Sequence, residues 1–325
     1  MKQKIIALTM GDPGGVGPEI LIKTLKKRRS AARFLVIGSG QALKLVHEKL
    51  RLQLSFDRVS SEEELSQTNR PLLFWDVDGQ ISGKVQIGKI SKTNGSKALE
   101  SIRIAERLAR AKNVSAIVTA PLNKLAVRLV EPKFVGHTEF LAQQAHVKKY
   151  AMMFVGPKFL VALTTIHLPL CKVASAITKE LILEKIKLTS MFLKKYHFPK
   201  KEIAVCALNP HGRETGKEED RVIAPAVREA CRLGQKVSGP FPADSVFYEA
   251  YHGRYGAVLA MYHDQALAPF KMISFRDGVN VTLGLPYLRT SPDHGTAFDI
   301  AYSGKADPTS FQSALDLALR LLKAA

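Results

Sequence analysis

The sequence has few cysteines, few aromatic residues and no long hydrophobic run. Its three cysteines (Cys171, Cys206 and Cys231) are an odd number without paired spacing, which argues against a disulfide framework and favours a reducing compartment. None of the apolar runs approaches the roughly 20 residues that span a membrane, and the apolar stretch after Lys4 is too short for a signal peptide. We therefore expect a cytoplasmic protein with no membrane partner.

Acidic residues are also scarce. The chain has 29 Asp and Glu against 48 Lys and Arg, which gives a formal net charge of +19. Such an excess can indicate a nucleic-acid-binding protein, which would show salt-sensitive retention on DNA. The basic residues are spread along the sequence, however, and no aromatic residues interleave a basic patch. We expect mostly solvated helix faces, a few cations that bind an anionic substrate, and no nucleic-acid partner.

The pattern of hydrophobic residues indicates an α/β fold. Apolar, strand-like runs alternate with amphipathic helical segments, as in βα units with a largely parallel core. The expected strands include Ile5–Thr9, Phe34–Gly38, Leu72–Asp76 and Ala116–Thr119, and the expected helices include Pro18–Lys27, Ala42–Leu50, Ser96–Lys112 and residues 179–197, 221–233 and 312–323. The length of 325 residues favours two domains. Because no linker separates the halves, a middle domain inserted into the first is expected.

Three histidines, His167, His211 and His263, each follow an apolar run. If these runs are buried strands, each histidine emerges at a carboxyl end, the edge where open α/β sheets bind ligands. Imidazole is the commonest metal ligand, and three such groups leave a coordination position open for substrate. Any one of them could be a hydrogen-bonded loop residue, but their shared placement predicts a metal-assisted enzyme. Asp244 and Asp264 could orient the ligands.

A glycine-rich segment, residues 11–19, follows the first strand and opens the first helix. Glycines allow close approach of a ligand to the backbone, and the start of a helix favours anions. The segment lacks the third glycine of the dinucleotide fingerprint and the Gly-Lys-Ser/Thr of a P-loop. A tight structural turn therefore explains it at least as well as a ligand-binding loop.

Two further regions carry groups suited to an anion. In Gly136-His137-Thr138-Glu139, His137 and Thr138 could meet an anion at a helix start, but Thr138 could equally be the N-cap of that helix. Later in the chain, Lys271, Asn280 (in a polar turn) and Arg289 suit a phosphate or carboxylate.

Several motifs together carry a resemblance to a known family. The chain resembles the 4-hydroxythreonine-4-phosphate dehydrogenase family of pyridoxal phosphate biosynthesis over nearly its full length. Its first and last motifs are also similar to those of the isocitrate and isopropylmalate dehydrogenases. The motifs occur in this order: Gly11–Glu19, Thr119–Lys124, Gly136–Glu139, Asn209–Glu214, Tyr262–Gln265 and His294–Ala301.

The resemblance implies a fold and an assembly. The fold would be the two-domain α/β/α isocitrate/isopropylmalate dehydrogenase-like type, with the active site in the interdomain cleft. The first domain would comprise residues 1–127 plus 288–325, with the cofactor loop, and the second would comprise residues 128–287, with the metal, substrate and dimer contacts. The protein would be a homodimer whose active sites contain residues of both subunits.

The resemblance also implies the roles of individual residues. His167, His211 and His263 match divalent-metal ligands, with His263 expected from the partner chain; His137, Thr138, Lys271, Asn280 and Arg289 match substrate contacts; His294, Gly295 and Thr296 match the NAD or NADP site. Three imidazoles favour Zn or Co over Mg, without excluding Mg.

The implied activity is a metal-dependent, NAD(P)-linked oxidation. The substrate would be 4-phosphooxy-L-threonine, oxidised at C3 to 2-amino-3-oxo-4-phosphooxybutanoate, which decarboxylates to 3-amino-2-oxopropyl phosphate in vitamin B6 biosynthesis. Candidates for the general base are Asp244, Asp264 and Lys124, as well as a metal-bound water. The alternative is a sister dehydrogenase of 4-phospho-D-threonate or 4-phospho-D-erythronate, because the motifs do not encode the exchange of an amino group for a hydroxyl.

Overall fold

The computed structural model describes residues 4–28 and 32–324. The chain divides into two compact units: residues 1–146 with 285–322, and residues 147–284 with the last three residues. Residues 1–3 and 325, at the ends of the predicted first domain, lie outside the described residues. Among the described helices, none has the length and apolar character needed to cross a bilayer.

The first unit is built on a parallel sheet in the order β3-β4-β2-β1-β5-β12. All four strands expected here from the sequence are confirmed, and β2 begins one residue before its expected start. The strands are β1 (Ile5–Thr9), β2 (Arg33–Gly38), β3 (Asp57–Arg58), β4 (Leu72–Asp76), β5 (Ala116–Thr119) and β12 (Leu288–Pro292). Its central strands are buried throughout, which explains their continuous apolar runs.

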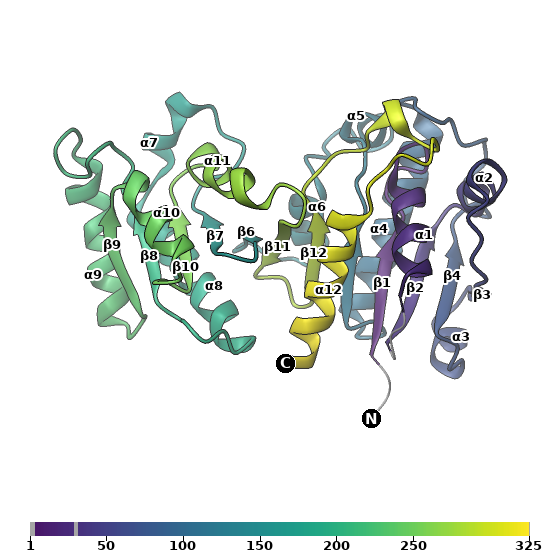
Figure 1. The fold of residues 1–325 in the computed structure, drawn as a ribbon, viewed down its shortest axis with the longest axis horizontal. Helices are drawn as coiled ribbons and strands as arrows, with labels where there is room; N and C mark the ends of the chain where they lie inside the picture. The colour runs from purple at the N-terminus through teal and green to yellow at the C-terminus, as the bar shows by residue number, and fades with distance from the viewer. Residues whose placement is uncertain (1–3, 29–31, 325) are drawn as a thin grey trace. The chain divides into compact units, whose positions relative to one another are not determined.

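Helices cover both faces of this sheet (Figure 1). Helices α1 and α12 lie on the side facing the viewer, and α4 lies behind the strands. The helices of this unit are α1 (Gly17–Lys26), α2 (Gly40–Leu50), α3 (Glu62–Gln67), α4 (Lys92–Arg110), α5 (Lys124–Arg128), α6 (His137–Gln144) and α12 (Thr309–Ala324), with a 3-10 turn at Phe298–Ile300. Three of them begin where a serine side chain (Ser39, Ser61 or Ser91) accepts a backbone N–H of the first turn.

The first unit extends past the predicted domain boundary at 127/128. Phe134, Phe140 and Leu141 pack with Leu99 and Ile102 of α4 in one apolar cluster. Burial of these side chains ties residues 128–146 to the first unit, which ends at His146. The chain returns to the first unit at Leu285, three residues before the segment 288–325 that the resemblance implies.

The second unit has the strand order β11-β6-β7-β10-β8-β9. Strands β7, β10, β8 and β9 run parallel, but β6 is antiparallel to both β7 and β11, so the expected parallel core is interrupted there. The reason is the short connection between β6 and β7, because such a link can only join antiparallel neighbours. The strands are β6 (Ala151–Val155), β7 (Leu160–Leu163), β8 (Ile203–Cys206), β9 (Val237–Phe241), β10 (Ala257–Ala260) and β11 (Val279–Leu283).

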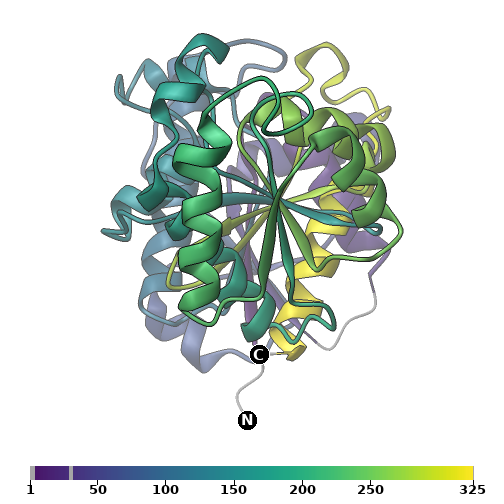
Figure 2. The same ribbon diagram turned by 90° about the vertical axis from the view of Figure 1, so that its left-hand side faces the viewer.

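Helices lie on both sides of these strands as well (Figure 2). On one face, Phe270 of α11 and Phe247 of α10 meet Phe159 at ring-centroid distances of 5.8 and 5.7 Å, within a cluster that includes side chains of β7, β8 and β10. The helices are α7 (Val173–Ala176), α8 (Lys179–Lys195), α9 (Ala224–Arg232), α10 (Ala243–Tyr251) and α11 (His263–Ser274), with a 3-10 turn at Leu170–Lys172 and a π-helical turn at Glu219–Ile223.

The polar turn predicted around Asn280 is wrong. Strand β11 begins at Val279, and Asn280 pairs with Phe154 of β6. The alternation of apolar and polar residues that is typical of a strand begins only after Gly278. The polar residues before it made the segment resemble a turn.

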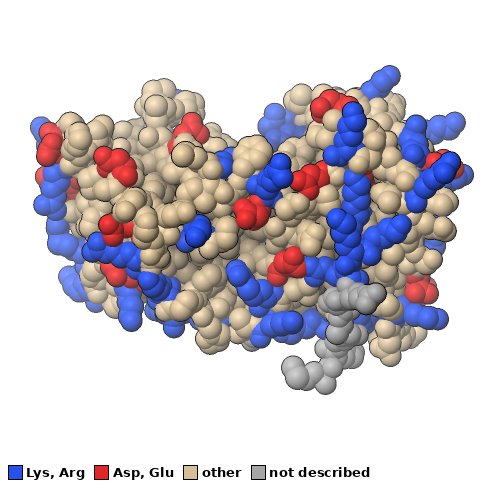
Figure 3. Space-filling view, in the orientation of Figure 1, with Lys and Arg blue, Asp and Glu red and all other residues tan. Residues whose placement is uncertain are grey.

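Basic side chains are dispersed among acidic and neutral ones over the visible face of each unit (Figure 3). This distribution agrees with the expectation of solvated helix faces.

Lys97 of α4 is a basic residue that the fold buries almost completely, at 1% exposure. Its Nζ lies 2.8 Å from Asp78 Oδ1 and donates to the carbonyl oxygen of Gly83 at 3.1 Å. The pair fixes the segment after β4 against α4. Removal of one partner leaves the other charge buried without compensation.

We therefore expect Lys97→Met to lower the free energy of unfolding by about 3 kcal/mol, measured by urea denaturation. Lys92→Met, at an exposed position of the same helix, is the matched control and should change it by less than about 0.5 kcal/mol. Equal effects of the two substitutions would contradict a stabilising role for the buried pair.

Candidate active site

The three histidines emerge at one edge of the second sheet. Strands β7, β10 and β8 are adjacent and parallel, so their carboxyl ends face the same way. His167 follows β7, His263 follows β10 as the first residue of α11, and His211 follows β8 in a loop. The sequence-based expectation that all three leave strand ends is confirmed.

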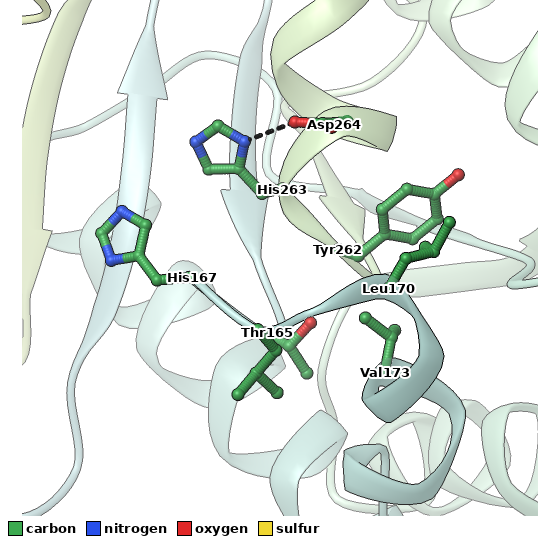
Figure 4. A pocket seen from close by; sticks show the side chains of 8 residues that line it. Thr165, His167, Leu170, Val173, Tyr262, His263 and Asp264 are labelled. Carbon is green, nitrogen blue, oxygen red and sulfur yellow. Dashed lines mark hydrogen bonds and ion pairs between the residues drawn. The ribbon is translucent and has the colours of Figure 1, made fainter.

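Two of these histidines lie close together (Figure 4). The ring centroids of His167 and His263 are 5.9 Å apart, and both line a cavity of about 390 Å³. The remaining wall is largely apolar and comes from the segments after β7 and β10; it comprises Thr165, Leu168, Leu170, Val173, Tyr262 and Asp264.

His263 is arranged as metal-binding histidines usually are. Its Nδ1 lies 2.7 Å from Asp264 Oδ1, and its side chain is 42% exposed. When Nδ1 donates to a carboxylate, the tautomer is fixed and Nε2 is left with its lone pair for a metal. The free Nε2 of His263 is therefore suited to bind a divalent ion.

His211 lies at the same sheet edge but does not line the cavity. In the part of the chain that the structure describes, no three His, Cys, Asp or Glu side chains lie close enough to hold an ion together. The assignment of all three histidines to one metal, and of His263 to the partner's site, remains a prediction.

The backbone at two of the histidines is unusual. His167 and His211 have φ values of 49° and 55°, in the left-handed region. His146 and His197 share this conformation, but they follow the ends of α6 and α8, where it commonly terminates a helix. His167 and His211 follow strands instead. Strained backbone of this kind concentrates at functional sites, which supports a role for both residues.

The three candidates for a general base differ in their surroundings. Asp264 is engaged with His263, and its side chain is 86% exposed. Asp244 is exposed in the first turn of α10, after β9, at the same sheet edge. Lys124 begins α5 in the first unit, and its charge acts on His137.

In the first unit, predicted substrate contacts lie together with Lys124. Burial, and then the charges of Arg289 and Lys124, hold the pKa of His137 well below its usual value, so its imidazole is neutral. Its Nε2 is buried with no hydrogen-bond partner among the described protein atoms. Arg289 is buried in β12 and donates to Thr119 Oγ1 at 2.7 Å. Burial lowers its pKa to about 10, which leaves it charged at neutral pH.

The interpretation of Thr138 as an N-cap is wrong. Helix α6 begins at His137, and Gly136 occupies the cap position without a side-chain bond. Thr138 is buried in the first turn. The sequence mimicked a cap because a threonine stands directly before an apolar stretch, with an acidic residue in the first turn.

The two predicted substrate contacts of the second unit are half-buried. Lys271 lies in the last turn of α11, with its Nζ 6.0 Å from the ring centre of Phe275. Asn280 lies in β11, where its Oδ1 is buried without a hydrogen-bond partner in the described residues.

The glycine-rich segment is a structural turn. Asp12 Oδ1 accepts the N–H of Gly14 at 2.9 Å, so this amide is not free for an anion. Gly11 has φ 72°, and a Cβ there would lie 2.1 Å from the carbonyl oxygen of Pro121. Close backbone approach, not ligand contact, accounts for the glycine.

This turn supports the loop that follows β12. Val16 N–H donates to the carbonyl oxygen of Thr296 at 2.9 Å, and Tyr302 Oη donates to that of Pro13 at 2.6 Å. Glu19, fully buried, accepts the N–H of Ala306 at 3.0 Å. Residues 294–306, which include the predicted cofactor residues, are thereby fastened to the first βα turn. His294 and Gly295 themselves are exposed.

Comparison with known proteins identifies the family. The family model "Pyridoxal phosphate biosynthetic protein PdxA" matches residues 30–318. A 4-hydroxythreonine-4-phosphate dehydrogenase of Desulforapulum autotrophicum is 40% identical, covering 97% of this chain and 94% of its own. The chain belongs to the PdxA family.

Other members of the PdxA family carry a different name. A D-threonate 4-phosphate dehydrogenase of Salmonella typhimurium is 38% identical over 99% of this chain and 100% of its own.

The crystal structure of a 4-hydroxythreonine-4-phosphate dehydrogenase from Klebsiella pneumoniae matches with a TM-score of 0.87 at 37% identity, covering 99% of this chain and 100% of that one. The protein is thus a PdxA-family dehydrogenase.

The expected fold is also confirmed. A β-decarboxylating dehydrogenase of Thermococcus kodakarensis, 14% identical, matches with a TM-score of 0.54 over 99% of this chain and 84% of that one. At this identity the likeness concerns the fold alone, and it is the isocitrate-dehydrogenase-like fold expected from the first and last motifs.

Several residues beside the predicted ones in each unit were not expected from the sequence. Thr119 holds Arg289, and Tyr262 and Leu170 line the cavity beside His263. Tyr262 and Thr119 lie inside recognised motifs, which was an available signal. Leu170 had none, because only the fold of the segment after His167 brings it to the cavity.

Asp12 predicts a pH dependence of stability. Burial raises its pKa from 3.8 to about 6. A group whose pKa is higher in the folded state favours folding at low pH, and this contribution is lost as the pH rises through the folded pKa. The stability of Asp12→Asn relative to the wild type should therefore rise between pH 4 and pH 8, by about 2.4 kcal/mol. Urea unfolding at both pH values measures this, and an unchanged difference would contradict it.

Proposed function

We propose that this protein is a metal-dependent, NAD(P)-linked dehydrogenase that oxidises 4-phosphooxy-L-threonine at C3. The product would be 2-amino-3-oxo-4-phosphooxybutanoate, which loses carbon dioxide to give 3-amino-2-oxopropyl phosphate, a step of vitamin B6 biosynthesis. The observation that carries the proposal is His263 with Asp264 behind it, the arrangement of a metal-binding histidine, in a chain of the PdxA family.

The proposed metal ligands are His167 and His211 of one subunit and His263 of the partner subunit. A bound Zn, Co or Mg ion supplies a Lewis acid that makes the substrate hydroxyl more acidic, and NAD(P) supplies the hydride acceptor. Asp264 holds the His263 ring in one tautomer, with Nε2 turned away from the carboxylate. Neutral imidazoles bring no negative charge, so they do not weaken the ion as a Lewis acid, whereas carboxylate ligands would.

The oxidation moves a hydride from C3 to the nicotinamide and releases the hydroxyl proton. Asp244, Asp264 and Lys124 are the proposed acceptors of that proton. Of these, Asp264 already accepts a hydrogen bond from His263. The exposed Asp244 at the same sheet edge keeps its carboxylate free of any such described bond, which favours it over Asp264.

Substrate contacts are proposed in each unit. In the first unit, Arg289 provides a fixed cation for an anionic group, because its bond to Thr119 orients the guanidinium. His137 is neutral, so it contributes a hydrogen bond, not a charge; Thr138 follows it. In the second unit, the proposed contacts are Lys271 and Asn280, whose buried Oδ1 can accept a donor from the substrate.

The cofactor and the assembly belong to the same proposal. His294, Gly295 and Thr296 would contact NAD or NADP, in a loop that Val16 fastens at Thr296. We propose a homodimer whose active sites combine residues of both subunits. Three free thiols support the proposed cytoplasmic location.

The relatives also support a second candidate. The D-threonate 4-phosphate dehydrogenase of Salmonella typhimurium is 38% identical to this chain, against 40% for the 4-hydroxythreonine-4-phosphate dehydrogenase of Desulforapulum autotrophicum. This difference is too small to decide between an amino acid and a hydroxy acid. Oxidation of 4-phospho-D-threonate, or of 4-phospho-D-erythronate, is therefore the alternative.

Steady-state NADH or NADPH formation from each phosphorylated acid distinguishes the two activities. We expect kcat/KM for 4-phosphooxy-L-threonine to exceed that for both hydroxy acids by at least about tenfold, since a site built for an ammonium group leaves its partners unpaired when a hydroxyl replaces it. Faster turnover of 4-phospho-D-threonate would replace the first proposal by the second.

Substitution of His211 tests the metal. Loss of one of three ligands should abolish retention of Zn or Co and reduce dehydrogenase activity by at least about a hundredfold, with elemental analysis and NADH formation as the measurements. His252→Ala is the matched control, because His252 is an exposed histidine of the same unit that follows α10. Full activity and metal content in His211→Ala would refute the metal assignment.

A further inference from the structure

Glu139 brings a negative charge to the place where the proposed substrate contacts of the first unit lie. It is half-buried in the first turn of α6, directly after His137 and Thr138. The substrate proposed for this protein is an anion, and its proposed contacts in this unit are one cation and neutral groups. A carboxylate among them opposes the binding of that anion, so its position calls for a physical explanation.

The carboxylate of Glu139 lies near the ammonium group of Lys124. A Cβ built on Gly136 would lie 2.9 Å from Glu139 Oε2 and 3.6 Å from Lys124 Nζ. Both charged ends therefore occupy space that the side chain of any larger residue at position 136 would fill. Glycine directly before α6 leaves room for the carboxylate and the ammonium group together.

The charge of Glu139 also acts on Arg289. Burial lowers the pKa of Arg289 to about 10, and the negative charge of Glu139 opposes this shift, followed by Tyr287. Because Arg289 is only 2% exposed, water and salt screen its attraction to a nearby carboxylate very little. Glu139 thus brings its charge close to both cations, Arg289 and Lys124.

Arg289 has an anchor that does not involve Glu139. Its guanidinium donates to Thr119 Oγ1 at 2.7 Å, and the two residues lie on the adjacent strands β12 and β5. The carboxylate of Glu139, in contrast, ends a flexible side chain on a helix. An arriving anion can therefore displace the carboxylate while the guanidinium stays where Thr119 holds it.

The groups that attract an anion converge on His137. Burial, and then the charges of Arg289 and Lys124, lower the pKa of its imidazole, so both cations act at this ring. The first turn of α6 adds the positive end of the helix dipole. Glu139 belongs to the same turn, and its carboxylate interacts with the same cations that an anionic group of the substrate would use.

We propose that Glu139 is an internal competitor for the anion site of the first unit. Its carboxylate neutralises Arg289 and Lys124, and the anionic group of the substrate binds by displacing it. The proposal rests on the proposed function, because it takes this cluster as a substrate contact. A tethered carboxylate is present at a high local concentration, so weakly bound anions such as chloride do not displace it, whereas a dianionic phosphate ester does.

Two substitutions separate competition from a general effect of charge. Glu139→Gln removes the negative charge and keeps the size of the side chain. Glu131→Gln is the matched control, because it also removes one negative charge from this unit, at a site where Glu131 pairs with Arg103 at 3.6 Å. Adding Arg289→Met to Glu139→Gln removes the buried cation and thereby tests where the anion binds.

The measurement is the Kd of the full-length protein for inorganic phosphate, by isothermal titration at pH 8 and constant ionic strength. We expect Glu139→Gln to bind phosphate about tenfold more tightly than the wild type, because a tethered competitor is gone. Glu131→Gln should keep the wild-type Kd to within about twofold, since salt screens a distant exposed charge. Adding Arg289→Met to Glu139→Gln should abolish the gain.

Two results would overturn the proposal. One is an unchanged or weaker affinity in Glu139→Gln, which would make Glu139 a support for Arg289 and not a competitor. The other is a gain in affinity that survives Arg289→Met, which would place the phosphate elsewhere. If Glu139→Gln does not fold, Glu139→Ala takes its place with the same expected result. Failure of the proposed function is a separate outcome: no phosphorylated acid would then yield NADH or NADPH, while the phosphate titration still decides the role of Glu139.

Discussion

The parallel register of β7, β10 and β8 is the constraint on which the proposed metal site depends. Because the three strands are adjacent and run the same way, their following segments leave the sheet at a single edge. Segments more than 40 residues apart in the chain are thereby brought to that edge, where the ring centroids of His167 and His263 lie 5.9 Å apart. Side-chain hydrogen bonds also join the ends of these strands: Thr165 Oγ1 donates to the carbonyl oxygen of Met261, and Gln265 Nε2 donates to that of Ala207.

The first unit holds charged groups inside its folded core. Arg289 enters the sheet within a strand, and Thr119 of the neighbouring strand receives its guanidinium. Burial, and then the positive charges of Arg289 and Lys124, lower the pKa of His137. A cation that is buried and oriented before any ligand arrives needs little reorganisation to bind an anion, which is the basis of preorganised electrostatic sites.

Sequence reasoning reached the strands and the histidines because both depend on local patterns. The apolar run Ile5–Thr9 reads as a strand, and a histidine after such a run lies at a strand end. Properties set by distant residues were out of reach. Asn280 was assigned to a turn because the antiparallel partner β6 cannot be read from its own neighbours. The extent of the first unit depended on Phe134 packing against α4, a contact that sequence spacing does not specify.

The left-handed backbone at His167 and His211 has a consequence for how this chain can change. Glycine adopts that conformation freely, whereas any residue with a Cβ is disfavoured there by roughly 1–2 kcal/mol. At both positions the side chain proposed for metal binding is thus one that a search for stability alone would discard. Glycine at either position would relieve backbone strain and remove the side chain proposed for metal binding, so stability and metal binding oppose each other there.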